Sequence, residues 1–233
     1  MNSPNLFVFL IFAVVIGVFI LGAYLSAQRR KMLAAWAAAA GFSFDPGRNP
    51  MLESRYPFFQ CLQLGYNRYA YNVMSGSIEG RDCLEFDYHY TTGSGKSRED
   101  HTMSAVILES KIPLRQLYIR PETFFDHIAE FIGFEDIHFE SNEFSRRFHV
   151  HSPDRKWAFD VISQDTMQFL LDSPTFYIQF GPTSVIAYRT SVLSPPDFDA
   201  AANVIKGMYD RLPDYLVKQQ GGEIGAAPAP PGG

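Results

Sequence analysis

The first pattern along the chain is an unbroken apolar run. Residues 6–25 carry no charged side chain. As an α-helix with a rise of about 1.5 Å per residue, this run would be about 30 Å long, which matches the hydrocarbon core of a bilayer. No second run of comparable length follows. The pattern therefore predicts one transmembrane helix that contacts the lipid bilayer through residues 6–25.

The middle of the chain changes to a period of two, which is typical of half-buried β-strands. In the first such segment Tyr69, Tyr71 and Val73 fall on one face. The next two segments predict a hairpin with its loop at residues 92–100. The expected strands are 66–73, 81–90, 101–108, 116–119, 136–139, 144–150, 157–162, 175–180 and 183–188.

Three helices interrupt these strands. Pro121 suits the first position of a helix over 122–133, and Ser163 can cap one over 164–171. Ser194 and Asp197 resemble a capping box for a last helix, which places an apolar stripe at three-to-four spacing. Strand runs broken by single helices predict an α+β domain, in which about three helices pack on antiparallel sheet.

The composition divides the chain into four parts. We expect a transmembrane anchor at residues 1–26 and a juxtamembrane helix and linker at 27–49, where Gly41 can end the helix. The α+β domain should occupy 50–217. Residues 218–233 are rich in Gly, Ala and Pro, which predicts a disordered tail.

Basic residues beside the apolar run predict its orientation. Arg29, Arg30 and Lys31 follow the run directly, whereas the leader before it has no basic side chain. The positive-inside rule then places the N-terminus outside and the domain in the cytoplasm. A cleaved signal peptide would have a basic leader and a shorter apolar stretch, so we expect an uncleaved signal-anchor in the inner (plasma) membrane.

Overall composition removes several function classes. Hydrophobic residues make up 46% and charged residues 19%, which fits a folded core, and the net charge of −5 argues against nucleic acid as a partner. Two cysteines cannot build a disulfide scaffold. Cys61 and Cys83 lie in apolar surroundings and are expected to be reduced core residues.

One segment resembles a phosphate-binding loop without meeting its requirements. Residues 93–97 read GSGKS, but the P-loop pattern needs a glycine where Tyr90 stands and a helix directly after the serine. A β-patterned segment follows instead. We therefore expect a hairpin loop and no nucleotide.

Histidines and acids give only weak candidates for chemistry. His149 and His151 point to the same side of a predicted strand, but the expected hairpin at Ser141 sets His138 too far away to be a third metal ligand. That register would pair Asp136 with Arg147.

Asp82, Glu85 and Asp87 are expected on a solvated strand face. No metal site, cofactor or catalytic residue is therefore assigned.

The apolar run with its RRK cluster resembles a group of bacterial proteins, as do GFSFDP, FDYHYTTGSGK, IRPETFF and FESNEFSRRFHVHSPD. These proteins join one N-terminal membrane helix to a cytoplasmic domain of unknown function. The resemblance implies the same arrangement here and no particular activity.

The expected function is a membrane-tethered interaction or scaffolding module with a protein partner at the membrane. The alternatives are an enzyme whose active site is assembled from distant residues and a domain that senses a small ligand.

Overall fold

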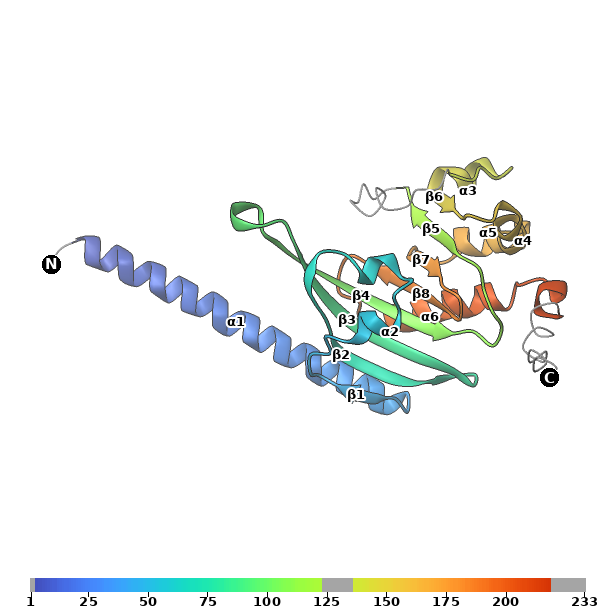
Figure 1. Ribbon diagram of the computed structural model, residues 1–233. Coiled ribbons are helices and arrows are strands. Elements are labelled where there is room, and N and C mark those ends of the chain that lie inside the picture. The colour runs from blue at the N-terminus through green and yellow to red at the C-terminus, as the bar shows by residue number, and fades with distance from the viewer. Residues whose placement is uncertain (1–2, 123–135, 219–233) are drawn as a thin grey trace, which may run out of the picture.

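An eight-stranded sheet and one long helix dominate the computed structural model, which describes residues 3–122 and 136–218 (Figure 1). The strand order is β1-β2-β3-β4-β8-β7-β5-β6, and every pair of neighbours is antiparallel. The strands are β1 Ser43–Asp45, β2 Tyr66–Ile78, β3 Arg81–Thr92, β4 Glu99–Glu109, β5 Leu117–Pro121, β6 Phe148–His151, β7 Tyr177–Phe180 and β8 Ser184–Arg189. The α+β prediction is confirmed.

Six α-helices accompany the sheet in the described part of the chain. They are α1 Ser3–Ala39, α2 Leu52–Arg55, α3 Asn142–Arg147, α4 Arg155–Val161, α5 Gln164–Asp172 and α6 Pro195–Tyr209. Two short 3₁₀ turns, η1 Gln60–Leu62 and η2 Gly95–Ser97, complete the elements.

The predicted caps of the last two helices are in place. Ser163 accepts a hydrogen bond from the Thr166 N–H at the start of α5, and Ser194 with Asp197 forms a capping box at α6. The helix expected over 122–133 falls almost entirely outside the described residues.

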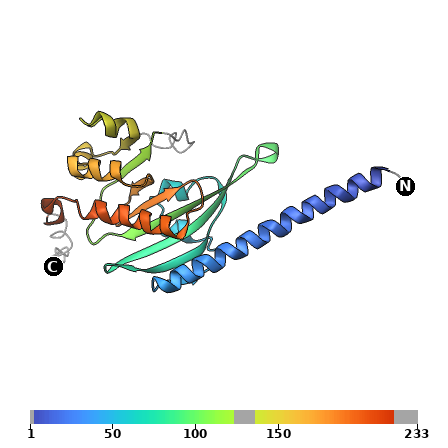
Figure 2. The ribbon, with the colours of Figure 1, turned by 180° about the vertical axis from the view of Figure 1, so that it is seen from behind.

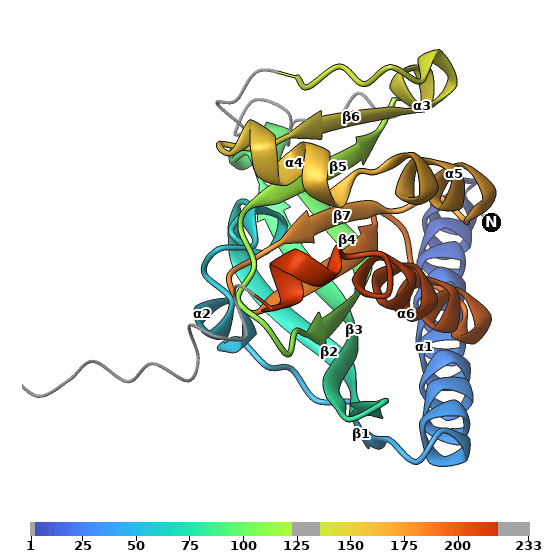
Figure 3. The ribbon, with the colours of Figure 1, turned by 90° about the vertical axis from the view of Figure 1, so that its right-hand side faces the viewer.

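The sheet separates two hydrophobic cores. On one face lie α6, the end of α1 and the helices α3 to α5, which cover a core that includes Val106, Phe180 and Phe198 (Figures 2 and 3). On the other face, α2 and η1 cover a core rich in tyrosine, including Tyr88 and Tyr188. Both faces of the central strands are therefore buried, and every residue of β3 from Cys83 to Thr91 is buried or half-buried.

The long helix α1 belongs to two environments. Its residues from 8 to 28 are exposed and almost all apolar. Further along, Leu33 and Ala37 are fully buried in the helix-covered core, and Trp36 packs against it. Gly41 then adopts φ +73°, a conformation that glycine reaches without strain, and the chain turns into β1. Part of the segment 27–49, expected as a juxtamembrane helix and linker, is thus packed in the domain.

One predicted strand and the first part of another are helices instead, whereas residues 148–150 of the latter do lie in β6. Residues 144–147 belong to α3, whose start is capped by Ser141 accepting from the Phe144 N–H. Residues 157–161 belong to α4, where Asp154 accepts from the Trp157 N–H. In both places a capping side chain and the burial of one helical face outweigh the alternation of the sequence.

The predicted hairpin at residue 141 is accordingly wrong, and so is its ion pair. Asp136 lies beside β6, where its carboxylate contacts Nδ1 of His149 at 2.7 Å. Arg147 instead donates to the carbonyl oxygen of Leu171 at 2.7 Å. The helical turn of α3 removes the strand register on which the expected Asp136–Arg147 pair depended.

Candidate functional site at the junction of α1 and the sheet

A partly buried ion pair joins α1 to strand β3 of the sheet. Arg29 donates from Nε to Oδ2 of Asp87 at 2.9 Å and from Nη2 to Oδ1 at 2.7 Å, a two-point contact. Its remaining Nη1 group donates to the carbonyl oxygen of Leu193 at 2.9 Å. One arginine side chain thus connects α1, β3 and the segment that leads into α6. We call this set of contacts the α1 junction.

Two further side chains complete the α1 junction. Asp87 is fully buried, and its carboxylate accepts from Nδ2 of Asn72 at 2.8 Å and from Oγ of Ser104 at 2.5 Å. Ser104 also accepts from the Leu193 N–H at 3.0 Å. A buried carboxylate is tolerated when cations and hydrogen bonds compensate its lost hydration, and here four donors do so.

Local backbone geometry brings these groups together. The alternation of β3 turns Cys83, Glu85 and Asp87 toward the face that α1 and α6 cover. On β2, a register shift between Tyr71 and Met74 accompanies Asn72, whose φ is +51°. Asparagine tolerates this conformation better than most residues, so the irregularity can turn its side chain toward Asp87.

The sequence analysis singles out both Arg29 and Asp87 but does not predict the contact between them. Asp87 was expected on a solvated face, and that expectation is wrong because α1 and α6 cover it. Arg29 is also expected to help set the membrane orientation of the chain. That role stays a prediction, in addition to the contacts that Arg29 makes in the structure. One signal was available, since Arg29, Leu33 and Ala37 follow one another at intervals of four and share a helix face.

Glu85 is the second buried acid under the helices. It is 2% exposed, and one of its oxygens finds no hydrogen-bond partner within the described residues. Burial, followed by repulsion from the Asp199 carboxylate, raises the pKa of Glu85 to about 7. The solvated face expected for Glu85 is also wrong.

The histidine candidates lie at the opposite end of the sheet. His149 on β6 contacts the carboxylates of Asp136 and Glu122, and His151 stacks near it with ring centroids 6.5 Å apart. His138 is exposed. Over residues 3–122 and 136–218, no group of three or more potential metal ligands is close enough to hold a metal ion.

The GSGKS segment forms the tip of the β3–β4 hairpin. Gly93 and Gly95 adopt φ values of +65° and +58°, and β4 begins two residues after Ser97. No helix N-terminus follows Lys96, so the geometry that a P-loop uses to hold phosphate is missing from this segment.

The two cysteines lie on opposite faces of the sheet. Cys61 belongs to the tyrosine-rich core and Cys83 to the helix-covered core, and both are free and buried. Burial raises the pKa of both thiols. The sheet itself separates them, so they cannot form a disulfide with each other in this fold.

Comparison with known proteins gives one informative likeness. No protein-family model and no curated protein matches the chain. Among solved structures, the crystal structure of the mycobacterial trehalose monomycolate transport factor A, TtfA, is similar with a TM-score of 0.57. The alignment covers 79% of this chain and 96% of the TtfA chain at 14% sequence identity. The two proteins share a fold.

The remaining functional feature is the exposed part of α1. It is the one helix in the described ranges that is long and apolar enough to cross a membrane, and its most apolar window is not buried by any other segment. At about 1.5 Å per residue its 37 residues extend about 55 Å, which exceeds the thickness of the hydrocarbon core.

Proposed function

We propose that this protein is a single-pass membrane protein whose α+β domain serves as a non-catalytic interaction module for a protein partner in the same membrane. Its N-terminus lies outside and its domain lies in the cytoplasm, against the inner membrane. The single observation that carries the proposal is the division of α1 into an exposed apolar part and a part buried in the domain core.

The α1 junction sets the distance between domain and membrane. Arg29 stands four residues after Leu25, the last residue of the apolar run, which corresponds to about 6 Å along a helix. Because Arg29 is bonded to Asp87 on β3, the domain is joined to α1 close to the end of the apolar run. The domain is therefore held at the membrane surface in one orientation and not suspended on a flexible linker.

A fixed orientation favours recognition of a membrane partner. Confinement to the same surface raises the effective concentration of the domain near that partner, and a rigid connection presents one chosen face. Figures 1 and 2 show the tip of the β3–β4 hairpin projecting from the sheet on the side toward which the N-terminal part of α1 runs. We assign this side of the domain to the partner.

The likeness to TtfA supports the class of partner. TtfA is a transport factor for trehalose monomycolate, and its fold covers most of this chain. We carry over only the general role of a transport factor. The partner proposed here is therefore a membrane transport protein, and its cargo is left open.

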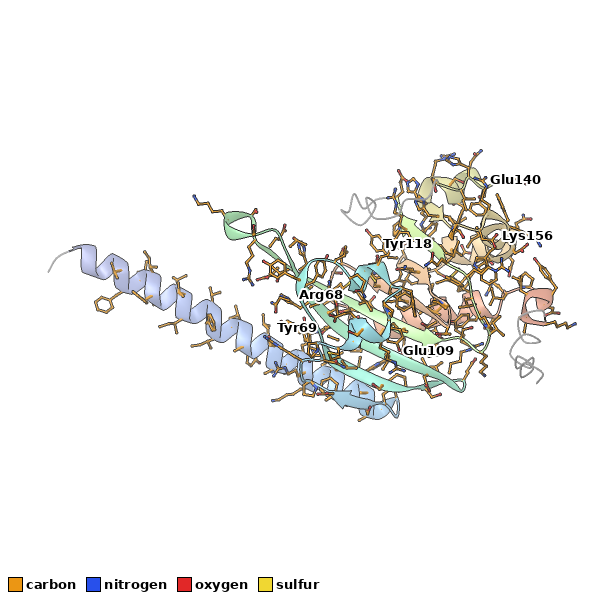
Figure 4. All side chains as sticks on the ribbon, in the orientation of Figure 1. Arg68, Tyr69, Glu109, Tyr118, Glu140 and Lys156 are labelled. Carbon is orange, nitrogen blue, oxygen red and sulfur yellow. The ribbon has the colours of Figure 1, made fainter. Side chains whose placement is uncertain are left out.

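Site-specific crosslinking tests the proposal. A photoreactive residue replaces Ser94 at the hairpin tip, and a matched control replaces Lys156, which is at the far end of the domain (Figure 4). We expect Ser94 to crosslink to an integral membrane protein and Lys156 not to do so. Equal labelling at both positions, or labelling of soluble proteins only, would contradict the proposal.

Topology is tested separately with a C-terminal tag in intact spheroplasts. Protection of the tag from added protease until lysis supports a cytoplasmic domain. Digestion of the tag in intact spheroplasts overturns the proposed orientation.

A further inference from the structure

A hollow opens between α1 and the sheet, directly beside the α1 junction. It has a volume of about 330 Å³, near the lower end of the range for small-ligand sites. Leu25, Ser26 and Arg30 of α1 form one wall, and Tyr71, Asn72 and Val192 lie opposite. Leu25 ends the apolar run, so the hollow lies at the level where α1 would leave the bilayer.

The hollow is lined by two arginines, and one of them, Arg30, is free to bind an anion. Arg29 also lines it but is committed to Asp87 and Leu193. Arg30 is exposed, and no acid forms an ion pair with it anywhere in residues 3–122 and 136–218. An unpaired guanidinium at a membrane surface attracts anions, above all phosphate groups.

The opposite wall offers an unused acceptor. Nδ2 of Asn72 is held by Asp87, which fixes the orientation of the amide. Asn72 is only 3% exposed, and its buried Oδ1 atom finds no hydrogen-bond partner in the described chain. A buried oxygen without a partner is unusual in a folded protein, and a hydroxyl donor that reached it from the hollow, after a small displacement of the wall, would satisfy it.

Together these features complement the chemical groups of one kind of ligand. The hollow pairs a cation with a hydrogen-bond acceptor, and its rim carries Leu25 and Val192, which is 50% exposed. A phospholipid headgroup likewise combines a phosphate and a polar substituent with acyl chains next to them.

We propose that the hollow binds the headgroup of an anionic phospholipid, with its phosphate at Arg30 and a headgroup hydroxyl on the polar wall near Asn72. This inference rests on the proposed function, because it requires α1 to cross the bilayer. The bound lipid then fills the space between α1 and β2 and adds a contact between membrane and domain beside the α1 junction.

The test uses the full chain in detergent micelles, titrated with phosphatidylglycerol or phosphatidylcholine and followed by native mass spectrometry. We expect one phosphatidylglycerol molecule to be retained in preference to phosphatidylcholine. Arg30→Gln should weaken the retention about fivefold, the usual contribution of one basic residue at a membrane surface. Lys31→Gln removes the same charge from the next residue, which does not line the hollow, and should leave retention unchanged.

A second variant tests shape without changing charge. Ser26 is exposed on α1, so Ser26→Phe should fill the hollow without disturbing the core and should also abolish the preference. Equal effects of Arg30→Gln and Lys31→Gln, or unchanged retention in Ser26→Phe, would overturn the lipid site. Extraction of the chain from membranes by alkaline carbonate tests the anchor independently, so failure of the proposed function can be told apart from failure of the lipid site.

Discussion

The two parts of α1 obey different rules although they form one continuous helix. From residue 8 to residue 28 every side chain is exposed, and apolar residues surround the helix on all sides. From Arg29 onward a single stripe of Arg29, Leu33 and Ala37 meets the domain, and Trp36 packs beside it. We call these the outer and inner parts of α1.

This difference shows how the two parts of one continuous helix can be suited to two different environments. A helix that is apolar all round suits lipid, whereas a helix with one buried stripe suits the surface of a folded domain. The change happens at Arg29, where the side chain that ends the apolar pattern is also the one that binds Asp87. The inner part of α1 and the domain therefore form one packed structure, from which the outer part extends.

The largest effect should come from breaking the α1 junction. Arg29→Met leaves the fully buried Asp87 carboxylate without its cation, which typically destabilises a protein by about 3–5 kcal/mol. Denaturant unfolding of the full chain in detergent measures the change. Arg30→Met is the matched control, because Arg30 is exposed and makes no ion pair within the described residues. Equal stability of the two variants would mean that the junction contributes nothing.

The second-largest loss of stability is expected from the apolar residues in the inner part of α1. Leu33 is fully buried, so Leu33→Ala removes a core side chain and is expected to lower the free energy of unfolding by about 3 kcal/mol. Met32 is 45% exposed, and Met32→Ala should change it by less than about 0.5 kcal/mol. A small effect at Leu33 would indicate that α1 separates easily from the domain.

Glu85 sharpens the comparison from the side of the sheet, because it is a buried acid under the helices that forms no ion pair within the described residues. Its pKa of about 7 in the folded state lies above the unfolded value of 4.5, so the folded chain binds more protons between these values. Stability should therefore fall as pH rises from about 4.5 to 7 and stay low above that window.

Glu85→Gln should abolish this fall and raise stability at pH 8 by about 2–3 kcal/mol. The exposed Asp82 on the same strand provides the control Asp82→Asn, which should keep the pH dependence of the parent. A pH profile that Glu85→Gln leaves unchanged would refute the assignment.

The smallest effect is expected far from α1. The side chains of His149 and Asp136 are 22% and 27% exposed, and ion pairs of this kind contribute about 0–1 kcal/mol. His149→Gln should therefore lower thermal stability only slightly more than His138→Gln, which changes an exposed histidine. A loss as large as that of Arg29→Met would show that this region, and not the α1 junction, is the more critical ion-pair site.

Local signals in the sequence predicted much of the fold. The end of α1 at Gly41, the β3–β4 hairpin and the caps at Ser163 and Ser194 depend on residues close to one another in the chain. Helix α4 has such a signal too, since Asp154 stands where a capping residue belongs, but the alternation after it favours a strand.

The α1 junction could not be predicted in the same way. Arg29 and Asp87 are 58 positions apart, and strand alternation indicates only that Asp87 shares a face with Glu85. Whether that face is exposed to solvent or buried depends on where α1 and α6 pack, which is a property of the whole fold. For the same reason the hollow beside Arg30 has no counterpart in any sequence motif.

The most direct test of the account follows the chain's two tryptophans separately during unfolding in detergent. Trp36 reports on the inner part of α1 and Trp157, which is 2% exposed, on the domain core, so Trp157→Phe and Trp36→Phe each leave one reporter. If α1 and the domain are one packed structure, both fluorescence transitions will share a midpoint. Exposure of Trp36 at clearly lower denaturant than Trp157 would contradict the account.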